Sequence, residues 1–345
     1  MRRIVNAAYL VLAAACILGI LLPASPLPSA AGPAPSRSWH SFSPPVANVV
    51  FHGGFIGGTP SRPGVVSDTP LFVGFGRDNS FPQAYASGTL QFLQELARSA
   101  GSPSNPLAPI TTLHDGGGRP LADSVSSEAP QHIHLRAPTG RSACQPDTAR
   151  NVYPDGSAFT SCIVSTYLES TVTDELTRMD SPFGVDRIYS VFLPQGIEVC
   201  DGSNDVAQGG TCNWGSGTRA FGAFHVGYCL GEQVSCTAST AAVLTVEPYP
   251  AGSHPGAAVG ADVGTTVGNL IHELAEAITD PVPQQPGWIA DNAGATSGGE
   301  VGDVCETVAV PFHQDPDGFR WNVQLGSDRY LSQGLFDARG PTCRP

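Results

Sequence analysis

The sequence predicts a single domain of the α/β class, of the α+β kind, with a mixed β-sheet, few helices and long loops. Two observations predict this class. Many short strand-like apolar runs alternate with only three helix-like segments, and 40 glycines and 31 prolines supply numerous loops. Helices and strands in this proportion form layered domains in which helices cover a sheet. We expect one domain over residues 46–345, held by disulfides.

The elements follow from hydrophobic periodicity. Strands are expected at Val46–Phe51, Pro70–Phe75, Arg187–Leu193, Ala220–Tyr228, Ala241–Val246, Arg320–Leu325 and Tyr330–Phe336. Helices are expected at Pro82–Ala100, at Leu168–Met179 and around His272, where apolar residues recur at helical spacing. Residues 101–160 are rich in glycine, proline and serine, so we expect mainly loops there.

The N-terminal segment has the features of a secretory signal peptide. Arg2 and Arg3 precede the apolar run Ile4–Leu22, and the small residues Ser29 and Ala31 stand where cleavage is expected. We therefore predict a signal peptide over residues 1–31 and a flexible Pro/Ser-rich lead over 32–45. The protein is then extracellular, with no membrane contact after cleavage. The alternative is an uncleaved membrane anchor, because the apolar run is almost long enough to span a bilayer.

The charge of the chain excludes some classes of function. Removing residues 1–31 takes away two arginines and leaves 15 basic against 30 acidic residues, a formal charge of −15. Nucleic acid is therefore excluded as a partner, because phosphate binding needs concentrated positive charge. The chain contains no lysine. Schiff-base chemistry and lysine-containing phosphate loops are excluded for that reason.

Eight cysteines follow the signal peptide, and an even number in an exported chain predicts disulfides. Short loops lose least entropy on closing. This favours Cys144–Cys162, Cys200–Cys212, Cys229–Cys236 and Cys305–Cys343, although the sequence alone allows about 105 pairings. A cysteine-ligated zinc is a poor alternative, because no Cys-x-x-Cys pair occurs.

A candidate metal site lies in the helix around His272. His272 and Glu276 are one helical turn apart on one face, so an imidazole nitrogen and a carboxylate can reach one cation. Glu273 occupies the position of the general base in the metalloprotease pattern His-Glu-x-x-His. Apolar residues nearly surround the helix, so its carboxylates need a cation, an arginine or protonation. Asp280, before Pro281, ends the helix and is an alternative ligand.

A second acidic cluster contains Glu300 and Asp303 beside Cys305. Together with the helix it resembles the gluzincin arrangement, and this resemblance implies that Glu300 is the third ligand and that Asp303 orients His272. His313 is a reserve ligand. Because Glu276 replaces a second histidine, the expected cofactor is one divalent cation, zinc ahead of calcium or manganese. His225 lies in an apolar strand-like run and is expected to be a core or edge residue.

Several segments together resemble secreted bacterial proteins similar to the plant EXORDIUM, or phosphate-induced, family. They are residues 48–55, residues 189–200, the helix His272–Pro281 with Gly287 and Trp288, the segment Glu300–Cys305, and the terminal Thr342 and Cys343. In the bacterial branch the helix and the Glu-x-Gly-Asp cluster occur together, which implies that they form one site.

These features lead to two hypotheses of function. The first is a secreted metal-binding protein with a zincin-like helix, a zinc-dependent hydrolase acting on extracellular peptides. In the second, a non-enzymatic extracellular protein binds a cell-wall component, and the same His/Glu cluster holds a structural ion or a hydrogen-bond network. The sequence leaves the substrate, the oligomeric state and the choice between these hypotheses open.

Overall fold

The computed structural model describes residues 48–76, 81–144, 159–201, 211–213, 220–230, 236–250, 261–291, 299–306, 308–316 and 318–345. All of them belong to one compact unit, residues 42–345. The predicted signal peptide and the lead over 32–45 lie outside the described residues. Among the described helices, none combines the length and the apolar character needed to cross a bilayer.

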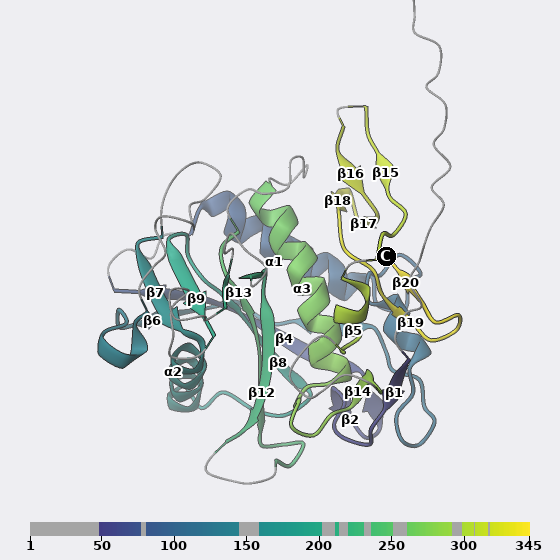
Figure 1. Ribbon diagram of the computed structural model, residues 1–345, viewed down its shortest axis with the longest axis horizontal. Helices are drawn as coiled ribbons and strands as arrows, with labels where there is room; N and C mark the ends of the chain where they lie inside the picture. Colours follow the sequence, from purple (N-terminus) through teal and green to yellow (C-terminus); the bar gives the residue numbers. More distant parts are fainter. Residues whose placement is uncertain are drawn as a thin grey trace, which may run out of the picture. The chain divides into compact units, whose positions relative to one another are not determined.

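A mixed six-stranded sheet forms the centre of the domain, which confirms the predicted fold class (Figure 1). Its strands are β4 (Val65–Phe75), β5 (Ser124–Ser127), β6 (Gln131–Leu135), β8 (Arg187–Phe192), β12 (Phe224–Cys229) and β13 (Ala241–Glu247). The order is β12-β13-β8-β4-β5, and β6 pairs with the second half of β4. All pairs in this sheet are parallel except β12 with β13, which is antiparallel.

Helices cover both faces of this sheet. They are α1 (Gln83–Arg98), α2 (Ser165–Arg178) and α3 (Ala261–Thr279). Side chains alternate between the two faces of a strand. In β4, Val66 and Phe72 therefore join the core beneath α1 and α3, whereas Leu71 and Val73 join the core beneath α2. The result is a three-layer arrangement in which α3 crosses one face of the sheet (Figure 1).

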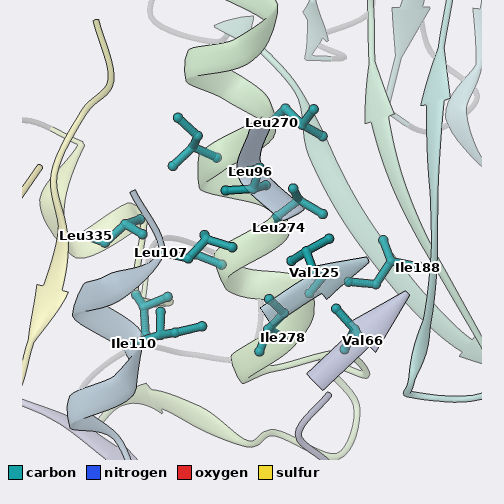
Figure 2. Packing of buried hydrophobic residues seen from close by; sticks show 14 of the residues in the cluster. Val66, Leu96, Leu107, Ile110, Val125, Ile188, Leu270, Leu274, Ile278 and Leu335 are labelled. Carbon is teal, nitrogen blue, oxygen red and sulfur yellow. The ribbon is translucent and has the colours of Figure 1, made fainter. Parts of the chain in front are cut away.

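The larger core lies between α3 and the sheet. Leu270, Leu274 and Ile278 project from α3 into a cluster that includes Val66 and Ile188 (Figure 2). Each of these side chains is at most 2% exposed. Burial of one such aliphatic side chain contributes about 1.5–3 kcal/mol. These buried contacts therefore fix the position of α3 on the sheet and of the side chains that α3 carries.

Smaller sheets flank this core. A four-stranded sheet contains β7 (Ser161–Val164), β9 (Ile197–Cys200), β10 (Cys212–Asn213) and β11 (Ala220–Phe221). Five two-stranded pairs are β1 (Val49–Phe51) with β14 (Trp288–Ala290), β2 (Gly58–Thr59) with β3 (Arg62–Pro63), β15 (His313–Gln314) with β16 (Arg320–Trp321), β17 (Val323–Leu325) with β18 (Asp328–Tyr330), and β19 (Leu335–Asp337) with β20 (Thr342–Arg344). The described residues also form the short 3-10 helices η1 (Ala108–Thr112), η2 (Gly140–Ser142) and η4 (Asp303–Cys305).

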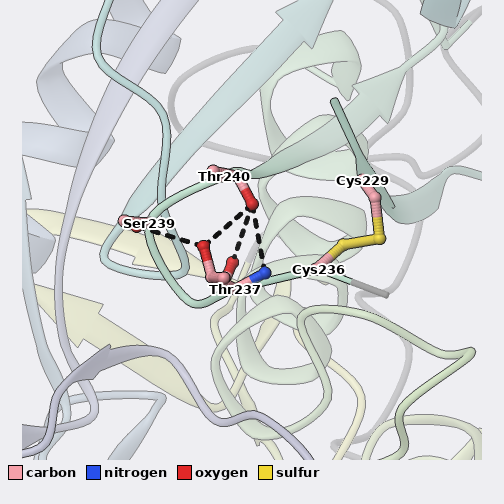
Figure 3. Close-up of a disulfide and its surroundings, with 5 residues drawn as sticks. All are labelled: Cys229, Cys236, Thr237, Ser239 and Thr240. Atoms are coloured by element: carbon pink, nitrogen blue, oxygen red, sulfur yellow. Dashed lines mark hydrogen bonds between the residues drawn. A yellow bond between two sulfur atoms is a disulfide. The ribbon is translucent and has the colours of Figure 1, made fainter. Parts of the chain in front are cut away.

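The structure forms the four disulfides that short loop closure favours, and they indicate an oxidising environment. Cys229–Cys236 joins the end of β12 to the segment before β13 (Figure 3). Cys305–Cys343 joins η4 to β20. The other two, Cys144–Cys162 and Cys200–Cys212, lie side by side in the small sheet, with Cys162 Sγ 3.4 Å from Cys200 Sγ.

The three predicted helices match α1, α2 and α3. Three predicted strands are each divided in two: Ala220–Tyr228 between β11 and β12, Arg320–Leu325 between β16 and β17, and Tyr330–Phe336 between β18 and β19. Three other differences have a clear cause. β4 begins at Val65 instead of Pro70, because parallel pairing with β5 and β8 holds its polar first half in the sheet. β5 and β6 lie within the segment predicted as loops, and their few residues each pair with the long β4. β7 and β9 are four residues each, too short for a periodic pattern.

Candidate metal centre

The candidate centre is built on the last two turns of α3. The helix is apolar on most sides and buried, so the polar residues His272, Glu273 and Glu276 are carried into the interior. Pro281 follows the helix, and α3 ends at Thr279 as the sequence predicts. Gly227 in β12 allows this end of the helix to approach the sheet, because a Cβ there would lie 1.6 Å from Pro281 O.

The first group of metal-ligating atoms contains His272, Glu276 and Asp303. His272 Nε2 lies 2.9 Å from Glu276 Oε1 and 3.5 Å from Asp303 Oδ1. The backbone N–H of Asp303 donates to the same Glu276 oxygen at 3.1 Å. Gln333 Nε2 lies 2.5 Å from His272 Nδ1 and donates to Gly302 O at 3.0 Å. The helix and the η4 segment are thus joined at Glu276.

The second group contains His225, Glu276 and Glu300. His225 Nδ1 lies 3.4 Å from Glu276 Oε2, and His225 Nε2 lies 3.5 Å from Glu300 Oε1. Nε2 is also 3.0 Å from the backbone carbonyl oxygen of Asp280. When Nε2 donates its proton to that carbonyl, the lone pair of Nδ1 points at the Glu276 side. A second hydrogen bond of this kind typically orients histidines that bind metals.

The three predicted ligands therefore do not form one triad. Glu276 belongs to both groups, whereas His272 and Glu300 belong to different groups. Asp303, predicted to orient His272, lies within 3.5 Å of His272 and is itself a ligand candidate. The pattern on α3 gave the correct helix face, but it could not show that a second imidazole approaches the same glutamate.

His225 and Gln333 are the two residues that sequence reasoning missed. His225 was expected to be a core or edge residue, and it is buried on the edge strand β12, with 3% of its side chain exposed. Its role was missed: Phe224 and Val226 pack toward α2, so strand alternation turns His225 toward α3. That alternation is visible in the sequence and could have identified the polar face of this strand. Gln333 lies between β18 and β19 and has no distinguishing pattern, so only the tertiary structure shows that it contacts His272.

The remaining predicted residues have different places. Glu273 Oε2 lies 3.8 Å from His225 Nδ1, so the proposed base is beside the site. Asp280 contributes its carbonyl to His225, while its Oδ1 accepts a hydrogen bond from the Gly287 N–H at 2.9 Å. His313 lies on the β15–β16 hairpin, stacked on Trp321 at a ring-centroid distance of 4.3 Å. His313 belongs to neither group of ligand atoms.

The electrostatics of the site are dominated by buried acids. Burial opposes the charged imidazole, but Glu300 and Glu276 outweigh it and raise the pKa of His225 well above its usual value. Glu276 and Glu273 raise the pKa of His272 in the same way, again against burial. Burial also raises the pKa of Glu300 well above its usual value. In the absence of a cation, the histidines and carboxylates of the site are therefore held together by protons that they share.

A divalent cation fits this arrangement. Two ligand atoms at about 2.0–2.1 Å from a tetrahedral zinc are roughly 3.4 Å apart. The separations from His225 Nδ1 to Glu276 and from His272 Nε2 to Asp303 are 3.4 and 3.5 Å, whereas His272 Nε2 and Glu276 Oε1 are at hydrogen-bond distance, 2.9 Å, and would have to separate around the cation. Glu300 Oε1 and Asp280 Oδ2 are buried, and the two carboxyl groups interact through a side-chain hydrogen bond that requires a proton on one of them. Buried carboxylates of this kind need a cation or a proton. The structure leaves the identity of the metal undetermined.

Among the described residues, no arginine forms an ion pair with the acids of the two groups. The arginine ion pairs found among the described residues are those of Arg98, Arg119, Arg178, Arg187, Arg329, Arg339 and Arg344, all with acids outside the two groups. The ion pairs found for Glu276, Glu300 and Asp303 are made to the two histidines. Within the described part of the chain, a cation or a proton is therefore the counter-charge of these acids.

A row of buried polar side chains continues from the site across the sheet. Thr245 pairs with His225 in the β12–β13 register. Thr245 Oγ1 donates to Ser190 Oγ at 3.1 Å, and Ser190 Oγ donates to Asp68 Oδ1 at 2.8 Å. Burial raises the pKa of Asp68 to about 7, although hydrogen bonds from Ser190 act against this. Asp68 therefore holds a proton in the folded protein until pH is nearly neutral.

Comparison with protein-family models, with curated proteins and with solved structures finds no match for this chain.

Proposed function

We propose that this chain is a secreted metal-binding protein whose centre on α3 carries out zinc-dependent hydrolysis of extracellular peptides. The observation that carries the proposal is the convergence of His225, His272, Glu276, Glu300 and Asp303 in two overlapping groups of ligand atoms. Imidazole and carboxylate ligands are the usual protein ligands of catalytic zinc. The four disulfides and the basic, apolar N-terminal segment support export.

The residues around the centre have the properties that such a hydrolase needs. A bound zinc would lower the pKa of water and polarise a carbonyl group. Glu273 is the proposed general base, and burial together with Glu276 raises its pKa, although His272 and His225 oppose this. A carboxylate whose pKa is raised takes up a proton more readily near neutral pH. Asp303, whose side chain is 24% exposed, gives the centre its most accessible edge.

The second candidate function is a structural ion in a non-enzymatic extracellular protein that contacts a cell-wall component. The observation that favours it is the burial of the inner ligands, because the side chains of His225 and Glu276 are each only 3% exposed. A cation held between them stabilises the contact between α3 and the edge strand β12. The resemblance to the EXORDIUM family remains a proposal, supported by the contact between the helix and the Glu300–Cys305 segment.

Two measurements distinguish these functions. The purified chain is analysed for metal by mass spectrometry, and peptidase activity is measured for the wild type and for Glu273→Gln. Hydrolysis should fall at least 100-fold in Glu273→Gln while the metal is retained. The matched control is Glu306→Gln, the same change at an exposed residue one position after Cys305. Bound metal without hydrolysis supports the structural role, and absence of bound metal refutes the proposal.

A further inference from the structure

The feature that carries a further inference is the position of the Glu276 carboxylate between two imidazoles. Oε1 faces His272 at 2.9 Å, and Oε2 faces His225 at 3.4 Å. The two groups of ligand atoms share only this residue. A carboxylate whose two oxygens face different ligand sets is placed to bridge two metal ions, as in sites where the ions are about 3.5–4 Å apart.

We propose that the centre binds two divalent cations, one held by His272 and Asp303, the other by His225 and Glu300, with Glu276 bridging them. This inference rests on the proposed metal-binding function. It changes the predicted cofactor from one ion to two.

The first position is defined on the exposed side of Glu276. His272 Nε2, Glu276 Oε1 and Asp303 Oδ1 provide one nitrogen and two oxygens. In the hydrogen-bonded state, Gln333 Nε2 donates toward His272 Nδ1, so the imidazole proton is on Nε2, facing Glu276. Coordination requires that proton to move to Nδ1. A half-turn of the Gln333 amide presents its oxygen to Nδ1–H and frees Nε2 for the cation.

The second position is defined on the buried side. His225 Nδ1 and Glu276 Oε2 face each other, and Asp280 O orients the ring through Nε2. Glu300 Oε1 lies 3.5 Å from Nε2 of the same ring, and the Glu300 and Asp280 carboxyl groups interact through a side-chain hydrogen bond. Asp280 is 0% exposed. Two buried acids in contact need a shared proton or a cation, and a cation on this side would meet both.

The formal charge of the centre also favours two cations. Glu273, Glu276, Asp280, Glu300 and Asp303 carry one negative charge each when ionised, a formal charge of −5 with both imidazoles neutral. Two divalent cations leave −1, whereas one leaves −3 in a buried site where uncompensated charge is costly. A single cation could also bind only one of the two imidazoles, because neither group of ligand atoms contains both.

The test is the stoichiometry of metal binding to the purified full chain, measured by calorimetry with Zn²⁺ and by metal analysis after gel filtration. The wild type should bind two ions per chain. Asp303→Asn and Glu300→Gln should each bind one, and Glu276→Gln should lose at least 100-fold in affinity at both positions. The exposed-residue control Glu306→Gln should still bind two.

A spectroscopic measurement keeps the test independent of the variants. With Mn²⁺ bound to the wild type, two ions bridged by Glu276 should give an exchange-coupled electron paramagnetic resonance signal. Two ions with uncoupled signals indicate a separate surface site and overturn the inference. One ion per chain also overturns it but leaves the proposed metal-binding function intact. No bound ion refutes both.

Discussion

Asp68 provides a quantitative test of the buried polar row beneath α3. The side chain is 0% exposed, and Ser190 Oγ donates to its Oδ1 at 2.8 Å. Burial raises the pKa of this carboxyl from 3.8 to about 7 in the folded protein. The carboxylate form is disfavoured because Oδ2 has no hydrogen-bond partner in the described part of the chain. Asp68→Asn keeps an acceptor for Ser190 and removes the charge.

The expected change depends on pH in a defined direction. A carboxyl group whose pKa is higher in the folded than in the unfolded state binds more protons when folded, so it loses stability as pH rises. The two pKa values differ by about 3, and each unit corresponds to about 1.4 kcal/mol, which gives ~4 kcal/mol. The loss begins near pH 4 and is complete slightly above pH 7. The free energy of unfolding of Asp68→Asn minus that of the wild type should therefore be about 4 kcal/mol larger at pH 8 than at pH 4.

Urea unfolding of both proteins from pH 4 to pH 8, with the disulfides intact, measures this difference. Asp174→Asn is the matched control, because it makes the same change at an exposed residue of α2. If the difference between Asp68→Asn and wild type is the same at pH 4 and pH 8, Asp68 is ionised in the folded protein and the reasoning is wrong.

Four further changes test the centre and its supports. Gly302→Ala places a Cβ 2.8 Å from both Glu276 Oε1 and His272 Nδ1. The metal affinity measured by calorimetry should therefore fall at least 10-fold. An unchanged affinity would show that the backbone around residue 302 moves to accommodate the Cβ. Gln333→Leu should weaken metal binding by about 10–100-fold through loss of the partner of His272, whereas Gln333→Glu should not; equal affinities for the two variants would exclude an orienting role. Carboxylates raise the pKa of both histidines, and metal binding must release their protons. Between pH 6 and pH 8 the metal affinity should therefore increase up to about tenfold per pH unit for each proton released. A metal affinity that does not change with pH would contradict this. The disulfide Cys305–Cys343 closes a separation of 38 residues. Its removal should lower the free energy of unfolding, measured by urea denaturation, by about 4 kcal/mol. A loss below about 1 kcal/mol would show that the loop is already constrained without the disulfide.

The helices and the three disulfides with sequence separations of 7, 12 and 18 residues could be predicted because their causes are local. Helical periodicity depends on neighbours three and four residues apart, and α3 ends before Pro281 for a reason that involves adjacent residues only. Cys229 and Cys236 are seven residues apart, so entropy alone favours their pairing. The short strands β5, β6, β7 and β9 were missed because their existence depends on partners distant in sequence.

The sequence by itself determined that the helix around His272 carries a histidine and two carboxylates on buried turns, and that these need a counter-charge. Only the tertiary structure decided which groups meet them. His225 lies in β12, more than 40 residues before Glu276 in the sequence. It contacts Glu276 because β12 pairs with β13 and because Gly227, which has no Cβ, lets β12 pack against the end of α3. Spacing along one helix fixes which side chains share a face, whereas contacts between separate elements are fixed by how the whole core packs.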